Sequence, residues 1–359
     1  MKKKILSGLL CVAMMTTLLV GCGSSEKAAE KPAEEPAKEE KVEGPIDIMW
    51  VTCSTQSEFW NYQQIGMENA ILDMEKEYGI DINFEVVGPA TEAETEAYVR
   101  AFENAIASKP DIIISATQVP DSTWSVSKAA MDQGIIVNFT NCGLEGMDTD
   151  EYSDCYNQFY TTVSSDIGKL AGETMLKMME EKGIKPEGTV SMEFSNVNAQ
   201  LQPRMDFLKS YLNEHATGLN VLDTLYNNND VEQAQSDIEN QIATYGDKLI
   251  GIYGANNISG AGIAIAVENA GIADKVISIG VDSDPVEIAA LEKGYLDCII
   301  VQDAYGQGYA SLVNAVETLL TGKNPESEQK VAMPPVAVTT DNMHEDEFAA
   351  MLDPTLLKK

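Results

Sequence analysis

The sequence predicts an α/β fold of two similar lobes, and three observations support this prediction. Continuous apolar runs of strand length, typical of strands buried on both faces of a parallel sheet, recur along the chain. Segments of helical length separate these runs, as in successive β-α-β units. The alternation proceeds to about residue 163 and then restarts over a similar length. We therefore expect two Rossmann-like lobes, each a parallel sheet flanked by helices, since 359 residues suffice for two cores.

The first half of the chain opens with the apolar run 46–51, which leads into a polar loop that ends at Phe59-Trp60. Gly79, Pro110 and Gly134 each follow a helical pattern, at positions where helices commonly end. On these signals the predicted strands are 46–51, 80–87, 111–115, 135–139 and 160–163, and the predicted helices are 58–78, 91–108, 122–133 and 166–182.

The second half repeats the pattern. Its predicted strands are 189–194, 219–226, 249–253, 276–281 and 297–301, and its predicted helices are 201–213, 231–245, 259–270, 285–293 and 305–320. Residues 331–338 form a late apolar run that contains proline. Because proline is confined to edge strands, we expect this run to lie at the edge of a sheet.

Charge and motif content exclude several classes of function. A formal net charge of −33 repels phosphate backbones, so we expect no nucleic-acid partner. The chain has 2 histidines, far apart, and its cysteine spacing does not suggest zinc, so we expect no metal site. It contains neither a Walker loop nor a G-x-S-x-G motif, and Gly260-Ala261-Gly262 lacks the third glycine of a dinucleotide fingerprint. We therefore expect no cofactor and no enzyme.

The N-terminus has the features of a bacterial export signal. A basic start at Lys2–Lys4 precedes an apolar run too short to span a membrane. Leu19-Val20-Gly21-Cys22 matches the lipobox, in which the cysteine is acylated. We predict a signal peptide over 1–21, a lipidated Cys22, and a disordered acidic tether over 22–45 that cannot form a core. The protein would then lie on the outer face of the cytoplasmic membrane, held by lipid.

Four cysteines remain after Cys11 and Cys22, namely Cys53, Cys142, Cys155 and Cys298. Export permits disulfides, and Cys142 and Cys155 are the best candidate pair because they bracket a loop rich in glycine and aspartate. The alternative is four free, partly buried thiols.

Polar side chains follow the predicted strands at the points where these strands end. They are amides, hydroxyls and carboxylates with very few cations, and the first loop adds the aromatic pair Phe59-Trp60. Such groups suit a neutral polyhydroxylated ligand, since amides and carboxylates bind hydroxyls and aromatic faces cover the C–H faces of a sugar ring. The alternative is that these asparagines and aspartates form turns and helix N-caps.

With these features in place, the chain resembles the substrate-binding proteins of sugar ABC importers, in particular the ribose/galactose-type family with the type I periplasmic-binding-protein fold. The resemblance covers about 46–338. Its landmarks are Phe59-Trp60, SSDIGKLAGETM at 164–175, IYGANNISGAG at 252–262, ISIGVDSDP at 277–285 and IIVQDAYGQG at 299–308.

The resemblance implies that the chain crosses between the lobes three times, near Val163, Gln302 and Glu328, and that this multi-strand hinge closes the lobes on a ligand. The N-terminal lobe would comprise 46–163 plus 303–328, and the C-terminal lobe 164–302 plus 329–359. The polar strand ends give Ser57, Gln118 and Asn141 as candidate ligand-binding residues. To these the resemblance adds Phe59, Trp60, Gln202, Arg204, Asn229, Asn256, Asp282 and Gln302. The implied protein is a monomer that delivers a sugar to an ABC permease in the membrane.

Two departures from the family pattern put ribose itself in doubt. Asn141-Cys142 stands where the ribose-type pattern has Asp-Arg, and Gln202 and Arg204 stand where the family has two arginines. The alternative for Arg204 is a structural arginine that forms an ion pair near the hinge. We therefore expect a monosaccharide or small sugar derivative as the ligand. The alternatives are a lipoprotein that senses a sugar or a furanose-like signal and presents it to a membrane receptor, and a nucleoside-binding transport protein.

Overall fold

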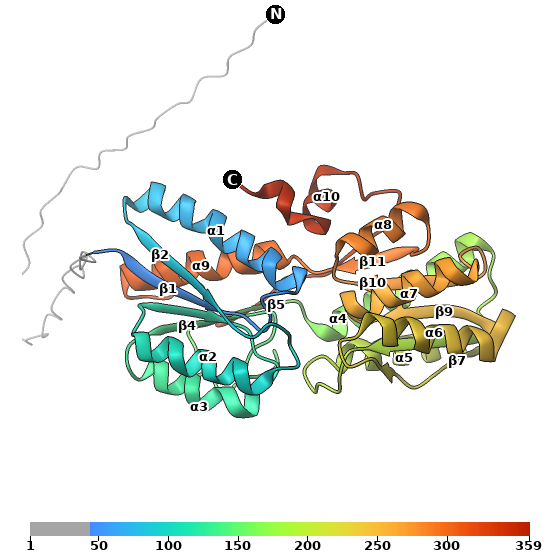
Figure 1. The fold of residues 1–359 in the computed structure, drawn as a ribbon, viewed down its shortest axis with the longest axis horizontal. Helices are drawn as coiled ribbons and strands as arrows, with labels where there is room; N and C mark the ends of the chain where they lie inside the picture. Colours follow the sequence, from blue (N-terminus) through green and yellow to red (C-terminus); the bar gives the residue numbers. More distant parts are fainter. Residues whose placement is uncertain (1–43) are drawn as a thin grey trace, which may run out of the picture. The chain divides into compact units, whose positions relative to one another are not determined.

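The computed structural model describes residues 44–359. The predicted signal peptide, Cys22 and nearly all of the predicted tether lie outside the described residues. Within them, the chain forms two sheets with helices on both faces (Figure 1). No described helix is long and apolar enough to cross a membrane.

The first sheet has six parallel strands in the order β12-β5-β4-β3-β1-β2. Figure 1 shows α1 and α9 on one face of this sheet and α2 and α3 on the other. The strands are β1 Ile46–Val51, β2 Ile82–Val87, β3 Ile112–Ser115, β4 Ile136–Thr140, β5 Gln158–Thr161 and β12 Lys330–Ala332, and the helices are α1 Glu58–Tyr78, α2 Thr95–Ser108, α3 Pro120–Met131 and α9 Ala304–Thr321.

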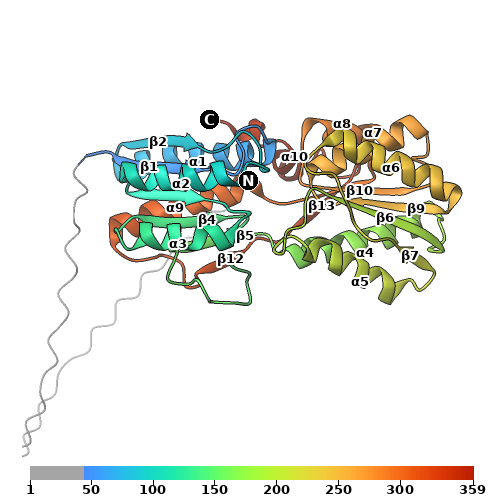
Figure 2. The same ribbon diagram turned by 60° about the horizontal axis from the view of Figure 1, so that its bottom comes forward.

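The second sheet runs in the order β13-β11-β10-β9-β6-β7, and β8 also pairs with β6. All of its pairs are parallel except that of β13 with β11. Figure 2 shows α6 and α7 on the opposite face of the sheet from α4 and α5. The strands are β6 Gly188–Phe194, β7 Leu219–Val221, β8 Leu225–Tyr226, β9 Leu249–Gly254, β10 Ile277–Val281, β11 Cys298–Val301 and β13 Val336–Val338. The helices are α4 Ser164–Lys182, α5 Pro203–His215, α6 Val231–Tyr245, α7 Asn257–Ala270, α8 Pro285–Lys293 and α10 Asp346–Leu352, with short 3₁₀ turns at Gly246–Lys248 (η1) and Pro354–Leu357 (η2).

The two sheets share one topology. With the short strand β8 set aside, the strand that comes first along the chain in each sheet (β1 or β6) lies between the next two (β2 and β3, or β7 and β9), and the remaining strands follow in order. The order therefore reverses beside β1 and β6, and in such sheets ligands bind outside the carboxyl ends of the strands at the reversal. The predicted α/β fold of two similar lobes is confirmed.

Two predicted strands were wrong in their extent. Residues 219–226 do not form one strand, because the chain leaves the sheet between β7 and β8. Residues 331–338 form β12 and β13, which pair with different sheets. Pro334 and Pro335 lie between them and have no N–H to continue a ladder, so the chain passes from one sheet to the other there.

The residue boundaries of the two lobes stay predictions, but two segments assigned to the C-terminal lobe lie against elements of the predicted N-terminal lobe. β12 belongs to the first sheet, although 329–359 was assigned to the C-terminal lobe. The unpredicted turn η2 contacts α1, and Asn69 Nδ2 donates a hydrogen bond of 2.7 Å to the carbonyl of Leu357. The end of the chain therefore returns to an element of the N-terminal lobe.

Glu193, at the end of β6, is fully buried, and neither carboxylate oxygen has a hydrogen-bond partner in the described structure. Burial, assisted by the charge of Asp237, raises the pKa of Glu193 from 4.5 to about 8. Because the folded-state pKa of Glu193 is raised, the folded state binds a proton more tightly than the unfolded state. The free energy of unfolding is therefore highest below about pH 4.5, and it decreases as the pH rises toward 8.

We expect Glu193→Gln to increase the free energy of unfolding at pH 7 by up to about 3 kcal/mol, because a neutral amide avoids the cost of protonating the carboxylate on folding. The gain should vanish near pH 4, where the carboxyl group of Glu193 is largely protonated in the unfolded state as well as in the folded state. Urea denaturation at pH 4, 5.5 and 7 measures this dependence. The control is Glu214→Gln at an exposed position, and a gain that does not change with pH would contradict the prediction.

Candidate ligand-binding site

A cavity of about 470 Å³, partly open to solvent, lies at the carboxyl ends of strands from both sheets. Its lining residues come from the strand ends, loops and first helical turns that follow β1, β2, β3 and β4 in the first sheet and β6, β9, β10 and β11 in the second. The lining comprises Phe59, Trp60, Glu92, Gln118, Asn141, Cys142, Phe194, Ser195, Asn196, Asn198, Leu201, Arg204, Asn256, Asn257, Asp282 and Gln302.

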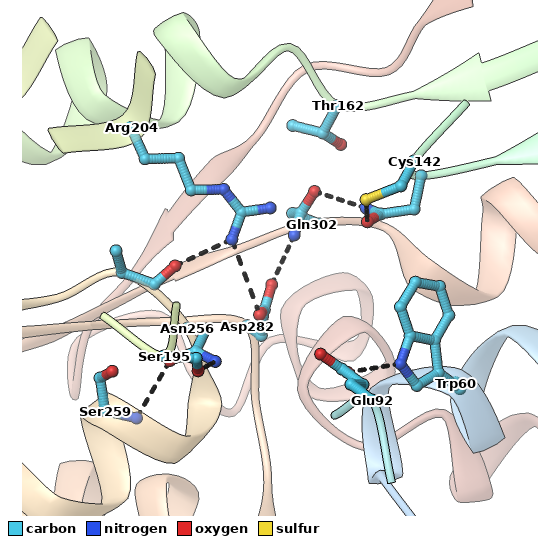
Figure 3. A network of polar contacts seen from close by, with 12 residues as sticks. Trp60, Glu92, Cys142, Thr162, Ser195, Arg204, Asn256, Ser259, Asp282 and Gln302 are labelled. Carbon is cyan, nitrogen blue, oxygen red and sulfur yellow. Dashed lines mark hydrogen bonds and ion pairs between the residues drawn. The ribbon is translucent and has the colours of Figure 1, made fainter. Parts of the chain in front are cut away.

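Three predicted residues form a chain of hydrogen bonds across this cavity. Gln302 Nε2 donates to Asp282 Oδ1 at 2.5 Å (Figure 3). Asn141 Nδ2 donates to Gln302 Oε1 at 2.9 Å. Gln302 follows β11 of the second sheet, whereas Asn141 follows β4 of the first. The amide of Gln302 therefore links groups from both sheets.

Asn141 and Asp282 have left-handed backbones, with φ of 57° and 78°. Asparagine and aspartate adopt this region more readily than other non-glycine residues, although it still costs energy. The left-handed turn redirects the chain directly after β4 and β10, so that both side chains enter the cavity instead of continuing the alternation of a strand.

Arg204 is the one cation among the residues that line the cavity. It lies in the first turn of α5 and is 3% exposed. Its Nη1 donates to the carbonyl of Ala255 at 2.8 Å and lies 4.0 Å from Asp282 Oδ2, while its Nε has no partner. Burial raises the pKa of Asp282, and the guanidinium of Arg204 and the amide of Gln302 oppose this rise.

Trp60 and Gln118 both donate to a carboxylate that the sequence analysis did not identify. Trp60 Nε1 lies 2.6 Å from Glu92 Oε1, and Gln118 Nε2 lies 2.5 Å from Glu92 Oε2. Phe59 packs edge-on against Trp60, with ring centroids 5.0 Å apart. Burial raises the pKa of Glu92, and the two hydrogen bonds partly oppose the rise.

Asn256 serves both as a cap and as a lining residue. Its Oδ1 accepts the N–H of Ser259 at 3.1 Å at the start of α7, and its Nδ2 donates to Ser195 Oγ. The alternative interpretation of such residues as helix N-caps is therefore correct for Asn256, but its side chain still faces the cavity.

Eight of the eleven predicted ligand residues line the cavity, and Ser57, Gln202 and Asn229 do not. Ser57 is the N-cap residue of α1, and its N–H donates to Ser54 Oγ at 3.2 Å. Gln202 contacts Asp206 and Tyr226 with its amide instead. Asn229 lies in the left-handed turn before α6 (φ 62°). All eleven assignments as ligand contacts stay predictions.

Most of the residues that sequence reasoning missed lie in irregular loops, where no strand or helix pattern fixes the direction of a side chain, whereas Phe194 ends β6 and Asn257 begins α7. Glu92 follows β2 in an acidic stretch, ATEAETEA, that resembles an ordinary solvated surface. A signal was present, because Glu92 also follows the carboxyl end of a predicted strand. The others are Cys142, Phe194, Ser195, Asn196, Asn198, Leu201 and Asn257.

The candidate disulfide between Cys142 and Cys155 was wrong, since all four described cysteines are free. The Cys142 thiol lines the cavity and donates to Asn141 Oδ1 at 3.2 Å, whereas Cys155 donates to Asp154 at 3.4 Å. Burial raises the pKa of Cys142 to about 12 and that of Cys155 to about 11.

We expect all four thiols to react slowly with iodoacetamide at pH 8 in the folded protein, because the thiolate is the reactive form and a raised pKa lowers its fraction. In urea without reductant, a chain of residues 23–359 should show four reactive thiols. Mass spectrometry of the alkylated protein counts them, and a count of two would reveal a disulfide.

Comparisons with known proteins agree with this fold and site. The family model for the periplasmic binding protein domain matches residues 48–324. The chain therefore belongs to the periplasmic binding protein family, a class of solute-binding proteins, not of enzymes. The type I fold inferred from the resemblance is confirmed.

Two relatives give this class more detail. The chain is similar to a putative rhizopine-binding protein of Rhizobium meliloti, with 27% identity over 68% of this chain and 76% of the relative. It is also similar to a xylose/arabinose-binding protein of Sulfolobus acidocaldarius, with 25% identity over 73% of this chain and 63% of that protein.

Solved structures share the fold at lower identity. A carbohydrate transporter solute-binding protein from Agrobacterium radiobacter, in complex with D-arabinose, aligns with a TM-score of 0.73 at 20% identity, over 86% of this chain and 99% of that one. A solute-binding protein from Agrobacterium vitis with bound D-fucose gives 0.72 at 24% identity, over 85% and 99%. One from Bacillus halodurans with bound myo-inositol gives 0.71 at 24% identity, over 86% and 99%.

Proposed function

We propose that this protein captures a monosaccharide or small sugar derivative in the cavity described above and delivers it to an ABC permease. The observation that carries the proposal is the lining itself, in which the Trp60 ring adjoins a network of amides, carboxylates and one guanidinium drawn from both sheets. Rings with several hydroxyls need this combination, since the aromatic face covers C–H groups and the polar network binds hydroxyls.

The similar proteins support this ligand class. The relatives are a xylose/arabinose-binding protein and a putative rhizopine-binding protein, and the similar structures hold D-arabinose, D-fucose and myo-inositol. Their ligands differ from one another, so the particular sugar must follow from the lining of this cavity.

We further propose that Cys22 carries a lipid and holds the protein at the outer face of the cytoplasmic membrane, beside its permease, as a monomer. The lipobox-like Leu19–Cys22 supports this anchoring, because two or more acyl chains on one cysteine give stable membrane attachment. Replacing Cys22 with serine should release the protein from the membrane fraction of expressing cells.

A thermal-shift screen tests the ligand class. Residues 23–359, which retain all described residues, are heated with D-arabinose, D-xylose, D-fucose, D-tagatose, D-glucose, D-galactose, myo-inositol, adenosine and uridine. Ligand at a hundredfold excess over Kd stabilises the folded state by about 2.7 kcal/mol. Trp60→Ala serves as the control, because it should abolish the shift.

A shift with a sugar or polyol that Trp60→Ala removes would support the proposal. A shift with only a nucleoside would support a nucleoside-binding transport protein, and no shift with any compound would overturn the assignment of a sugar. Calorimetry of the best compound would then give its affinity.

A further inference from the structure

The cavity carries one more acidic group than basic groups. Its lining contains two carboxyl groups, those of Glu92 and Asp282, and one cation, Arg204. Asp282 lies 4.0 Å from the Arg204 guanidinium, which partly balances its charge. Glu92 forms no ion pair in the described structure, because Trp60 and Gln118, which donate to it, are neutral, and the charge of Arg204 acts on it only without direct contact. The excess negative charge therefore belongs to Glu92.

Glu92 retains capacity to bind a ligand. A carboxylate has about four acceptor positions, and the two hydrogen bonds to Glu92 use one on each oxygen. Its side chain lines the cavity beside the Trp60 ring, opposite the group formed by Arg204, Asp282 and Gln302 (Figure 3). A ligand that fills the cavity would thus meet an uncompensated carboxylate and an indole on one side, and a balanced polar network on the other.

A cation on the ligand would complement the first side better than a hydroxyl. Hydrogen bonds between ionised partners are stronger than those with a neutral partner, and a partly desolvated site strengthens the attraction further. An ammonium group is also attracted to the face of an indole ring. An anionic substituent at the same place would be repelled by Glu92.

We propose that Glu92 is a specificity-determining residue that recognises a protonated amine, so that the preferred ligand is an aminated sugar or polyol. The inference rests on the proposed function, because it assumes that a polyhydroxylated ring enters the cavity. Burial raises the pKa of Glu92, and the hydrogen bonds from Trp60 and Gln118 and the charge of Arg204 partly oppose this rise.

Calorimetry with matched ligand pairs tests this inference. D-glucose and D-galactose are compared with their 2-, 3- and 6-amino-deoxy derivatives and with the corresponding uronates, at pH 5, 6 and 7, using residues 23–359. We expect the best amino derivative to bind at least tenfold more tightly than its parent at pH 7, and the uronates to bind less tightly than the parent. The preference should weaken as the pH falls through the raised pKa of Glu92, because protonation neutralises its carboxylate.

Two variants separate the role of Glu92 from general effects. Glu92→Gln keeps the size of the side chain and should reduce the preference for the amine to less than twofold while the parent sugar still binds. Glu96→Gln, at an exposed glutamate of α2, is the matched control and should leave the preference unchanged. The pH series on the unaltered protein gives an independent readout if Glu92→Gln impairs folding.

Equal binding of each amine and its parent would overturn the inference and leave the proposed function intact. A preference for amines that persists in folded Glu92→Gln, or that does not depend on pH, would also overturn it. If neither neutral nor aminated sugars bind, the proposed function fails, and this inference fails with it.

Discussion

Asp282→Asn should weaken binding of the sugar ligand about a hundredfold. Asp282 is 6% exposed in the cavity, accepts from Gln302 at 2.5 Å, and is the acidic group nearest Arg204 there, at 4.0 Å. Its carboxylate is the acceptor that a ligand hydroxyl would use, and a hydrogen bond to a charged acceptor contributes about 1.5–3 kcal/mol. A hundredfold loss in affinity corresponds to about 2.7 kcal/mol.

Asparagine is the informative substitution at this position. It has nearly the same shape and tolerates the left-handed backbone of Asp282 (φ 78°), so the chain should keep its path after β10. The change also leaves the buried Arg204 guanidinium with less compensation, and we expect the free energy of unfolding to fall by about 2 kcal/mol. Calorimetry measures the affinity, and urea denaturation measures stability.

Acidification should act on the unaltered protein in the same direction. As the pH falls through the raised pKa of Asp282, the carboxyl group protonates, and binding should approach that of Asp282→Asn. The matched control is Asp223→Asn, which removes an exposed partner of Lys209. An affinity of Asp282→Asn within threefold of the unaltered protein would remove Asp282 from the ligand site.

Gly66→Ala should destabilise the protein by at least about 3 kcal/mol, because α1 and α9 contact each other closely at this glycine. A Cβ atom at Gly66 would lie 2.1 Å from the carbonyl oxygen of Tyr305 and 2.9 Å from the N–H nitrogen of Tyr309. The contact is reciprocal, since a Cβ at Gly308 would lie 2.1 Å from the carbonyl oxygen of Gln63. The atoms in conflict are backbone atoms of two helices, which cannot move aside as a flexible side chain can.

Helix propensity alone would predict the opposite result, since alanine is favoured over glycine in a helix by about 1 kcal/mol. The sign of the effect therefore distinguishes interhelical contact from intrinsic preference. Urea denaturation measures the change, with Glu77→Ala on the exposed side of α1 as the control. A Gly66→Ala protein as stable as the unaltered one would show that the helices do not approach so closely in solution.

The local pattern of the sequence was sufficient to predict most elements. Buried strands such as β1 and β3 are continuous apolar runs, and glycine follows α1, α4 and α7 in a left-handed conformation at their C-termini. The predicted strand bounds were wrong where the pairing of strands, and not the local composition, decides which residues form one strand. β12 and β13 look like one strand along the chain, but their partners lie in different sheets.

The candidate site divides in the same way. Asn141, Asp282 and Gln302 follow parallel strands directly, and because the carboxyl ends of such strands meet at one edge of a sheet, their positions could be predicted from strand order. Glu92 and Ser195 could not be selected, because loop residues depend on contacts with distant segments for their direction. Trp60 Nε1 and Gln118 Nε2 hold Glu92 in place, from 32 and 26 residues away along the chain.

The sequence by itself determined the α/β alternation, the two lobes and the polar strand ends, because these depend on hydrophobic periodicity and local turn chemistry. Only the tertiary structure decided which polar groups share one cavity, that the cysteines are free, and that Glu92 has neutral partners. These properties depend on distances between segments far apart in the chain, and local patterns carry no information about such distances.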